Sequence, residues 1–357
     1  MSYRIDILHY RYCRRRPRTA GADDAARLQQ DGQPCIVVYD AHMTESMPFA
    51  GIASFLKASY IAEPKQADGD VAVLGVPWDE GTTNRPGSRY GPRAIRELST
   101  FYAYRSETDA YYDGEAEAFL LGGVRFVDTG DVDLAPTSPA ELWHPRVTER
   151  VARLLAAGLL PLTLGGDHSI TYPVLKAYAG RPVHLVQLDT HMDYWNDEGV
   201  DGMTHTHASP IVRSWEDGLV TAVSQYGIRG LHTPSDDIEL ARSRGVRIFW
   251  CEQAKRTPAD ELVAHIKPGE DVYVTFDIDA LDPSIAPGTG TPEPGGFTYY
   301  EAKALLRAVA RRGHLVGMDV VEVDPLFDPA QLTALHAVRL ILDTIGAALP
   351  STRFAVG

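Results

Sequence analysis

Two histidines and four aspartates that could bind a metal ion lie in three short segments, each directly after an apolar run. The segments are LGGDHS at 164–169, LDTHMDYW at 188–195 and TFDIDALDPS at 275–284, and they carry His168, Asp189, His191, Asp193, Asp277 and Asp279. Imidazole nitrogens and carboxylate oxygens are ligands that proteins offer to divalent metal ions. The three segments therefore indicate metal chemistry.

Asp189, His191 and Asp193 alternate with apolar or neutral residues in the second segment. Because successive side chains of an extended chain point to opposite faces, these three would share one face. A solvated edge strand is the alternative, but the apolar run HLVQL before Asp189 is typical of a buried strand. A buried unpaired carboxylate costs several kcal/mol, so this cluster requires a counter-ion.

The first and third segments carry weaker signals when each is taken alone. A lone histidine such as His168 is more often structural than a ligand, and the Asp277–Asp279 pair could be a structural network. Asp282, before Pro283, is predicted to be a turn or capping residue. Together, the side chains exceed the three protein ligands of a mononuclear catalytic zinc site and suit two divalent cations. Such a pair would share a water, lower its pKa and supply hydroxide near neutral pH.

The elements that must position these residues alternate between strand-like and helix-like runs from Asp70 onward. Strands are predicted at 71–77, 124–130, 159–166, 184–191, 222–229, 246–252, 272–279 and 315–323, and helices at 91–101, 139–157, 299–312 and 329–348. This alternation predicts a three-layer α/β/α sandwich with a mostly parallel sheet, formed by a single domain over residues 66–357. Because sites in such sheets form beyond the carboxyl ends of strands, the three segments can converge.

Residues 1–65 do not follow this alternation and are predicted to be an N-terminal extension. They include the basic run RYCRRRPR at 11–18. A lid over the site, an arm to a neighbouring subunit and a solvated extension all remain open interpretations of this segment.

The composition of the chain argues against some kinds of binding partner and some cellular locations. Acidic residues outnumber basic ones by 48 to 34, a net charge of −14, which argues against a nucleic-acid partner. Apolar stretches long enough to span a membrane are absent from the sequence, and a secretory signal is not expected. Three widely spaced cysteines indicate a reducing compartment, so we expect a cytoplasmic protein.

The three segments resemble the signatures of the ureohydrolase family, which includes arginase, agmatinase and guanidinobutyrase. GGDHS resembles the first metal motif, and DTHMD resembles the D-A-H-x-D motif with Thr190 in place of the common alanine. Residues 276–296 match the third signature, and GVPWDEGTTNRPGSRYGPRAIR at 75–96 is similar to the agmatinase-like branch. The resemblance extends from about Met47 to Ala347 and implies an arginase-like fold.

The resemblance also implies a role for each matching residue. One metal ion would be held by His168, Asp189, Asp193 and Asp277, and the other by His191, Asp189, Asp277 and Asp279, so that Asp189 and Asp277 bridge. Glu322, in DVVEVDP, would accept two N–H bonds from a guanidinium group. His207, in THTHASP, would move protons near the site, with His205 as the alternative because Ala208 stands where the family usually has glycine.

The implied reaction is attack of the metal-activated hydroxide on the carbon of a guanidinium group that Glu322 holds. Asp279 would accept the remaining proton of the hydroxide, and His207 would protonate the departing amine. The products would be urea, or a urea-like fragment, and an amine or ammonia. Oxygen-rich ligation makes Mn²⁺ the first expectation, which is also usual in the family, and Ni²⁺ the second.

The substrate is expected to be agmatine-like rather than free arginine, because Tyr194 and Trp195 follow Asp193 where an arginase would carry small polar residues. Trp195 is therefore a candidate substrate contact, and the acids of 196–203 could meet a cationic tail. Free guanidine, a biguanide-type compound and guanidinobutyrate remain alternatives.

Two other kinds of protein compete with this interpretation. One is a deacetylase-like amidohydrolase with a single zinc, against which the extra ligands argue. The other is a catalytically silent subunit that forms a hetero-oligomer with an active paralogue. The family resemblance itself implies a homo-oligomer, either a trimer or a hexamer.

Overall fold

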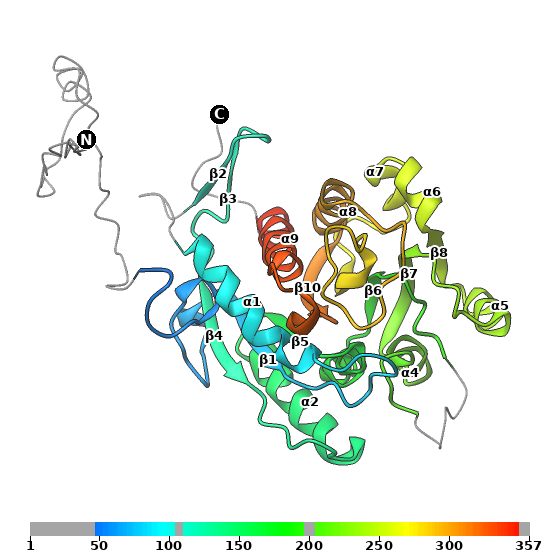
Figure 1. The fold of residues 1–357 in the computed structure, drawn as a ribbon, viewed down its shortest axis with the longest axis horizontal. Helices are drawn as coiled ribbons and strands as arrows, with labels where there is room; N and C mark the ends of the chain where they lie inside the picture. The colour runs from blue at the N-terminus through cyan, green and yellow to red at the C-terminus, as the bar shows by residue number, and fades with distance from the viewer. Residues whose placement is uncertain (1–46, 104–109, 196–203, 350–357) are drawn as a thin grey trace, which may run out of the picture. The chain divides into compact units, whose positions relative to one another are not determined.

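A parallel eight-stranded sheet forms the centre of the protein in a computed structural model that describes residues 47–103, 110–195 and 204–349 (Figure 1). The strand order is β4-β1-β5-β10-β9-β6-β7-β8, and every neighbouring pair is parallel. The strands are β1 (Val71–Val76), β4 (Phe126–Asp131), β5 (Leu160–Gly165), β6 (Val183–Leu188), β7 (Val220–Ile228), β8 (Arg247–Trp250), β9 (Asp271–Asp277) and β10 (His314–Val321). All eight were predicted from the sequence.

Helices cover both faces of this sheet. On one face α8 (Tyr299–Arg312) and α1 (Gly91–Ser99) pack against α9 (Leu332–Ala348), and on the other α2 (Ala140–Ala156) and α4 (Pro210–Glu216) pack against α3 (Thr171–Leu175). The remaining helices are α5 (Ser235–Ser243), α6 (Cys251–Arg256) and α7 (Ala259–Leu262). Alternate residues of β1 enter the two cores, Val73 with the first set of helices and Leu74 with the second. The predicted three-layer α/β/α sandwich is confirmed.

Local signals account for the bounds of the long helices. Helix α8 begins after a capping box in which the side chains of Thr298 and Glu301 accept each other's backbone N–H groups. Its bounds match the predicted range 299–312. Helix α9 begins at Leu332, three residues later than predicted, because Gln331 has a left-handed backbone (φ 55°) and the Asp328 carboxylate caps the amide of Ala334.

Two features outside the main sheet were not predicted. Strands β2 (Tyr111–Asp113) and β3 (Ala118–Leu120) form an antiparallel hairpin. Residues 55–61 pack against the domain. Phe55 is fully buried, and its amide donates to the Asp128 carboxylate at 2.8 Å. Tyr60 forms a parallel β-bridge with Asp128 of β4. The proposed boundary at residue 65 stays a prediction, and the basic run at 11–18 lies outside the described residues. In the described ranges, every helix is too short or too polar to cross a membrane.

Candidate metal centre

The three predicted segments and Glu322 meet beyond the carboxyl ends of four neighbouring strands, β5, β10, β9 and β6. His168 follows β5, Asp277 ends β9, and Asp189 follows β6. Strand β10 lies between β5 and β9, and Glu322 directly follows it. Parallel pairing therefore brings together side chains that lie more than 100 residues apart in the chain.

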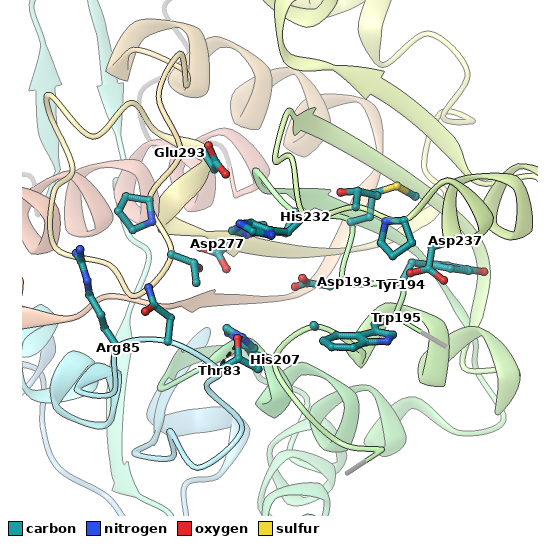
Figure 2. A pocket seen from close by; sticks show the side chains of 18 residues that line it. Thr83, Arg85, Asp193, Tyr194, Trp195, His207, His232, Asp237, Asp277 and Glu293 are labelled. Atoms are coloured by element: carbon teal, nitrogen blue, oxygen red, sulfur yellow. Dashed lines mark hydrogen bonds between the residues drawn. The ribbon is translucent and has the colours of Figure 1, made fainter. Parts of the chain in front are cut away.

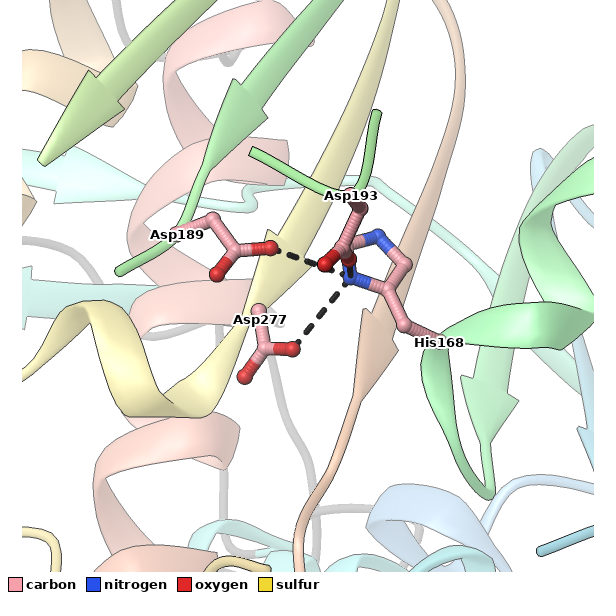
Figure 3. Close-up of side chains that lie close together, drawn as sticks. All are labelled: His168, Asp189, Asp193 and Asp277. Atoms are coloured by element: carbon pink, nitrogen blue, oxygen red, sulfur yellow. Dashed lines mark ion pairs between the residues drawn. The ribbon is translucent and has the colours of Figure 1, made fainter. Parts of the chain in front are cut away.

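Two groups of side chains at this edge, all of them buried except the half-buried His191, could each hold a metal ion. The first comprises His168, Asp189, Asp193 and Asp277, and the second comprises Asp189, His191 and Asp279. Figure 3 shows the first group, in which His168 Nδ1 lies 2.7 Å from an oxygen of Asp193 and 3.1 Å from one of Asp189. Asp189 belongs to both groups, as a bridging ligand must. Asp277 belongs to the first group only.

His168 is oriented by a chain of hydrogen bonds on the side away from the aspartates. Its Nε2 lies 2.8 Å from Thr275 Oγ1, and the Thr275 hydroxyl donates to Asp319 at 2.6 Å. Because the hydroxyl hydrogen of Thr275 is already donated to Asp319, the threonine oxygen must accept a hydrogen bond from Nε2–H of His168. Nδ1 is then left with a lone pair that faces the carboxylates, the arrangement that a metal-ligating histidine requires.

The charges of the cluster call for cations. Burial raises the pKa of Asp193 to about 6, and burial with the charges of two neighbouring aspartates raises the pKa of Asp277 well above its ordinary value. Burial would also raise the pKa of Asp189, but the two histidines beside it, His168 and His191, lower it. Buried carboxylates in such proximity can all stay ionised only beside positive charge, so the donor set fits divalent metal ions.

Two residues of the site have left-handed backbone conformations that side chains other than glycine rarely adopt. The φ angles are 48° at Asp193 and 62° at Glu322. Each such conformation costs about 1–3 kcal/mol and persists where the surrounding structure enforces it. Both residues follow strands of the sheet at its carboxyl edge, Asp193 after β6 and Glu322 after β10.

The two carboxylate oxygens of Glu322 differ in their hydrogen-bond partners. Oε1 accepts the backbone N–H of His168 at 2.9 Å and lies 3.1 Å from Nδ1 of His207. Oε2 is buried and has no hydrogen-bond partner among the described residues. A buried carboxylate oxygen without a donor is costly, so this atom is suited to receive an N–H group from a ligand.

The two histidines of THTHASP lie in different surroundings. The ring of His205 stacks on Tyr172 at 5.3 Å and packs edge-on against His144, within an aromatic cluster. The ring of His207 contacts Glu322 and lines the pocket in front of the metal ligands. This placement favours His207 as the residue that moves protons.

A cavity of about 660 Å³ opens in front of the cluster (Figure 2). Trp195 and Tyr194 line it, as the expected substrate contact requires. Among the described lining residues Arg85 is the one lysine or arginine, and Asp237 and Glu293 are the acids that are not metal ligands. The acids of 196–203, predicted to meet a substrate tail, lie outside the described residues.

Several lining residues were not singled out from the sequence. Thr83, Asn84 and Arg85 belong to the agmatinase-like segment 75–96, whose resemblance marked the segment but gave its members no role. Asp237 lies in the first turn of α5, a helix that no sequence signal connected to the site. Their positions depend on how the loops pack, which local sequence patterns do not specify.

An open parallel sheet with an oxygen-rich, two-group ligand set at its carboxyl edge is the architecture of a binuclear metallohydrolase. Comparison with known proteins is consistent with this: the model of the arginase family matches residues 69–346. The chain belongs to the arginase family, and as such it is a hydrolase of C–N bonds in guanidino compounds. The two ligand groups fit the binuclear divalent-metal centre of that family.

The curated relatives and solved structures cover most of the chain. The guanidinopropionase of Pseudomonas aeruginosa is 38% identical over 83% of this chain and 92% of its own length. The agmatinase of Chromobacterium violaceum is 35% identical over 83% of this chain and 88% of its own. The structure of proclavaminate amidino hydrolase from Streptomyces clavuligerus is 32% identical, with a TM-score of 0.74, and covers 86% of this chain and 100% of its own.

Proposed function

We propose that the protein hydrolyses an agmatine-like guanidino compound to urea and an amine at this site. The observation that carries the proposal is the free Oε2 of Glu322. It is buried on a side chain that contacts the candidate ligand His168 and also His207, which lines the cavity. A guanidinium group offers N–H donors to a carboxylate. The carboxylates of Asp237 and Glu293, which line the cavity, support a substrate with a cationic tail.

The first proposed metal ion is held by His168, Asp189, Asp193 and Asp277, and the second by His191, Asp189, Asp277 and Asp279. We propose Mn²⁺ because oxygen ligands dominate both sets, with Ni²⁺ as the alternative. When bound, the pair would lower the pKa of a water to make a nucleophile and offset the negative charge that develops during attack.

The protein's own residues would bind the substrate and move the protons. Glu322 is held rigidly through Oε1, so Oε2 would fix the plane of the guanidinium group against the ligand sets. Asp279, fully buried at the metal edge, would accept the proton of the nucleophile. His207 would deliver a proton to the departing amine, and Trp195 would form one wall of the channel for the tail.

A guanidino acid is a second candidate substrate, because Arg85 could pair with a carboxylate tail. Arg85 lies over the ring of Phe327 and, in Figure 2, toward the end of the cavity opposite Asp237. The name of the guanidinopropionase relative is consistent with this choice. Arg85→Gln should lower kcat/KM for guanidinobutyrate and spare agmatine if the tail is anionic. Asp237→Asn should do the reverse if the tail is cationic.

The class of substrate is tested by measuring bound metal and urea release in one preparation. The panel is agmatine, guanidinobutyrate, guanidinopropionate, arginine, guanidine and a biguanide, each with Mn²⁺ or Ni²⁺. We expect two metal ions per chain, turnover of one tailed compound, and a Glu322→Gln variant that keeps both ions but loses turnover. Full metal loading without urea from any compound would instead support the silent-subunit alternative.

Assembly and location are further proposals. The family resemblance supports a homo-oligomer, a trimer or a hexamer, and light scattering of the purified chain would measure its mass. A hetero-oligomer with a paralogue would show as turnover that appears only when the second chain is added. The few, widely spaced cysteines support a cytoplasmic location, which localisation of a tagged chain would test.

A further inference from the structure

The ring of His207 is held at both nitrogens, and one of the two partners has no assigned role. Nδ1 lies 3.1 Å from Glu322 Oε1. On the other side Nε2 lies 2.8 Å from the hydroxyl of Thr83 and accepts the Thr83 backbone N–H at 3.2 Å (Figure 2). Thr83 thus contacts the proposed proton-moving group directly from the wall of the cavity.

The chemistry of the two partners decides which nitrogen exchanges its proton. An ionised carboxylate can only accept hydrogen bonds, so Glu322 keeps a hydrogen on Nδ1. Nε2 is then the nitrogen that gains and loses a proton. A hydroxyl can accept from Nε2–H when the ring is charged and donate to Nε2 when the ring is neutral. The Thr83 amide can only donate, and it favours the neutral state.

The backbone around Thr83 is fastened so that this contact is maintained. The Gly81 amide donates to the Asp167 carboxylate at 2.7 Å, and the Gly81 carbonyl accepts the His207 amide at 3.0 Å. A side chain at Gly81 would come within about 3 Å of Ser169 and Asp167. The loop is therefore fixed to the end of β5 and to the backbone of His207, so that the hydroxyl of Thr83 faces the ring.

We propose that Thr83 is a positioning residue for proton transfer, whose hydroxyl holds Nε2 of His207 in both protonation states while Glu322 retains the hydrogen on Nδ1. The inference rests on the proposed function, in which His207 delivers a proton to the departing amine. The charged and titratable groups around the ring are Glu322, Asp167 and Asp193. The neutral ring would accordingly carry its hydrogen on Nδ1.

The test compares Thr83→Val with Thr83→Ser and with a matched control in the next position. Thr82→Val makes the same exchange of hydroxyl for methyl, and the Thr82 hydroxyl has no hydrogen-bond partner among the described residues. We expect Thr83→Val to lower kcat about tenfold, with KM within roughly twofold, because one hydrogen bond to the proton donor is lost. Thr83→Ser should restore most of the rate, and Thr82→Val should retain it.

The pH profile separates positioning from a general loss of structure. Without the hydroxyl, the charged ring loses its acceptor at Nε2, so the pKa of His207 falls. The general acid is then deprotonated at lower pH, and the basic limb of the kcat profile should move down by roughly 0.5–1 pH unit. An unmoved limb in Thr83→Val, or an equal shift in Thr82→Val, would overturn the proposal.

A second measurement does not depend on turnover. Nitrogen-15 spectra of the full-length histidine-labelled chain, loaded with diamagnetic Zn²⁺ and assigned with a His207→Asn variant, report the hydrogen position on the neutral ring. We expect it on Nδ1; a hydrogen on Nε2 would refute the proposal. If the wild-type chain releases no urea from any guanidino compound, the proposed function fails, but these spectra still decide how His207 is held.

Discussion

Replacing Thr275 by valine should weaken metal binding although Thr275 touches no metal ligand oxygen. The hydroxyl of Thr275 is fully buried between His168 Nε2, at 2.8 Å, and Asp319 Oδ1, at 2.6 Å. Valine keeps the shape of the side chain and removes both hydrogen bonds. Asp319 would retain the hydroxyls of Tyr273 and Thr171 on its other oxygen, so the strand should stay in place.

The size of the effect follows from what is lost. Outer partners of a metal-ligating histidine typically contribute 10–100-fold in affinity, which is about 1.4–2.7 kcal/mol. Two hydrogen bonds at ~1 kcal/mol each, together with an unsatisfied buried carboxylate oxygen, should lower the free energy of unfolding by about 3 kcal/mol. The affinity for the metal ion that His168 would bind should fall more than the affinity for the ion that His191 would bind.

The assay is competition for Mn²⁺ against a chelator of known affinity, with chemical denaturation of the metal-free chain alongside. Thr190→Val is the matched control, because the hydroxyl of Thr190 is buried beside the same ligands but has no hydrogen-bond partner among the described residues. Its affinity should stay within about twofold of wild type. If Thr275→Val binds Mn²⁺ as wild type does, or if Thr190→Val loses as much, the orienting chain from His168 to Asp319 has no role in metal binding.

Three further predictions follow from the same site and its surroundings. Asp189→Asn should reduce bound metal from two ions per chain to fewer than one, because Asp189 belongs to both ligand groups; elemental analysis of variant and wild type would show it, and unchanged loading would disprove the bridging role. Metal affinity should rise from pH 6 to pH 8, because the ions must displace protons from the two histidine ligands. Burial lowers the pKa of both histidines, but neighbouring carboxylates outweigh it, raising the pKa of His168 well above its ordinary value and that of His191 to about 12. Calorimetry in buffers of different ionisation enthalpy should detect protons released on binding, and the release of none would contradict this. Burial lowers the pKa of His144 from 6.5 to about 3, so the stability that its neutral form contributes is present above pH 6.5 and declines as the pH falls from 6.5 toward 3; the unfolding free energy of a His144→Phe variant should fall less steeply over that range, and an equal slope would refute the assignment.

Much of the architecture follows from local sequence patterns. Apolar runs such as VAVLGV in β1 and VHLVQL in β6 are buried on both faces, and continuous runs of this kind are typical of parallel strands between helices. The short hairpin of β2 and β3 was not predicted, because three-residue strands carry too little periodicity to be recognised. The start of α9 was predicted at Pro329 rather than Leu332, because the capping contact from Asp328 depends on packing.

The ligand set itself was readable because its residues come directly after recognisable strands. Asp189, His191 and Asp193 share a short segment, and the alternation of their side chains is a property of any extended chain. Their roles as ligands, and those of Glu322 and His207, stay predictions that the geometry supports. Trp195 was likewise placed in the cavity wall by its position directly after the ligand segment.

By itself, the sequence determined the order of strands and helices along the chain and the positions of the candidate ligands at strand ends, because these depend on local spacing. The family followed from the resemblance of the three motifs. Only the tertiary structure decided that His207 and not His205 faces Glu322. It also decided that the hydroxyl of Thr83 lies beside the ring of His207, and that of Thr275 beside the ring of His168. Thr83 and His207 are 124 positions apart in the chain, and His168 and Thr275 are 107 positions apart. No local pattern specifies which distant hydroxyl will meet which ring, because that depends on how strands and loops pack.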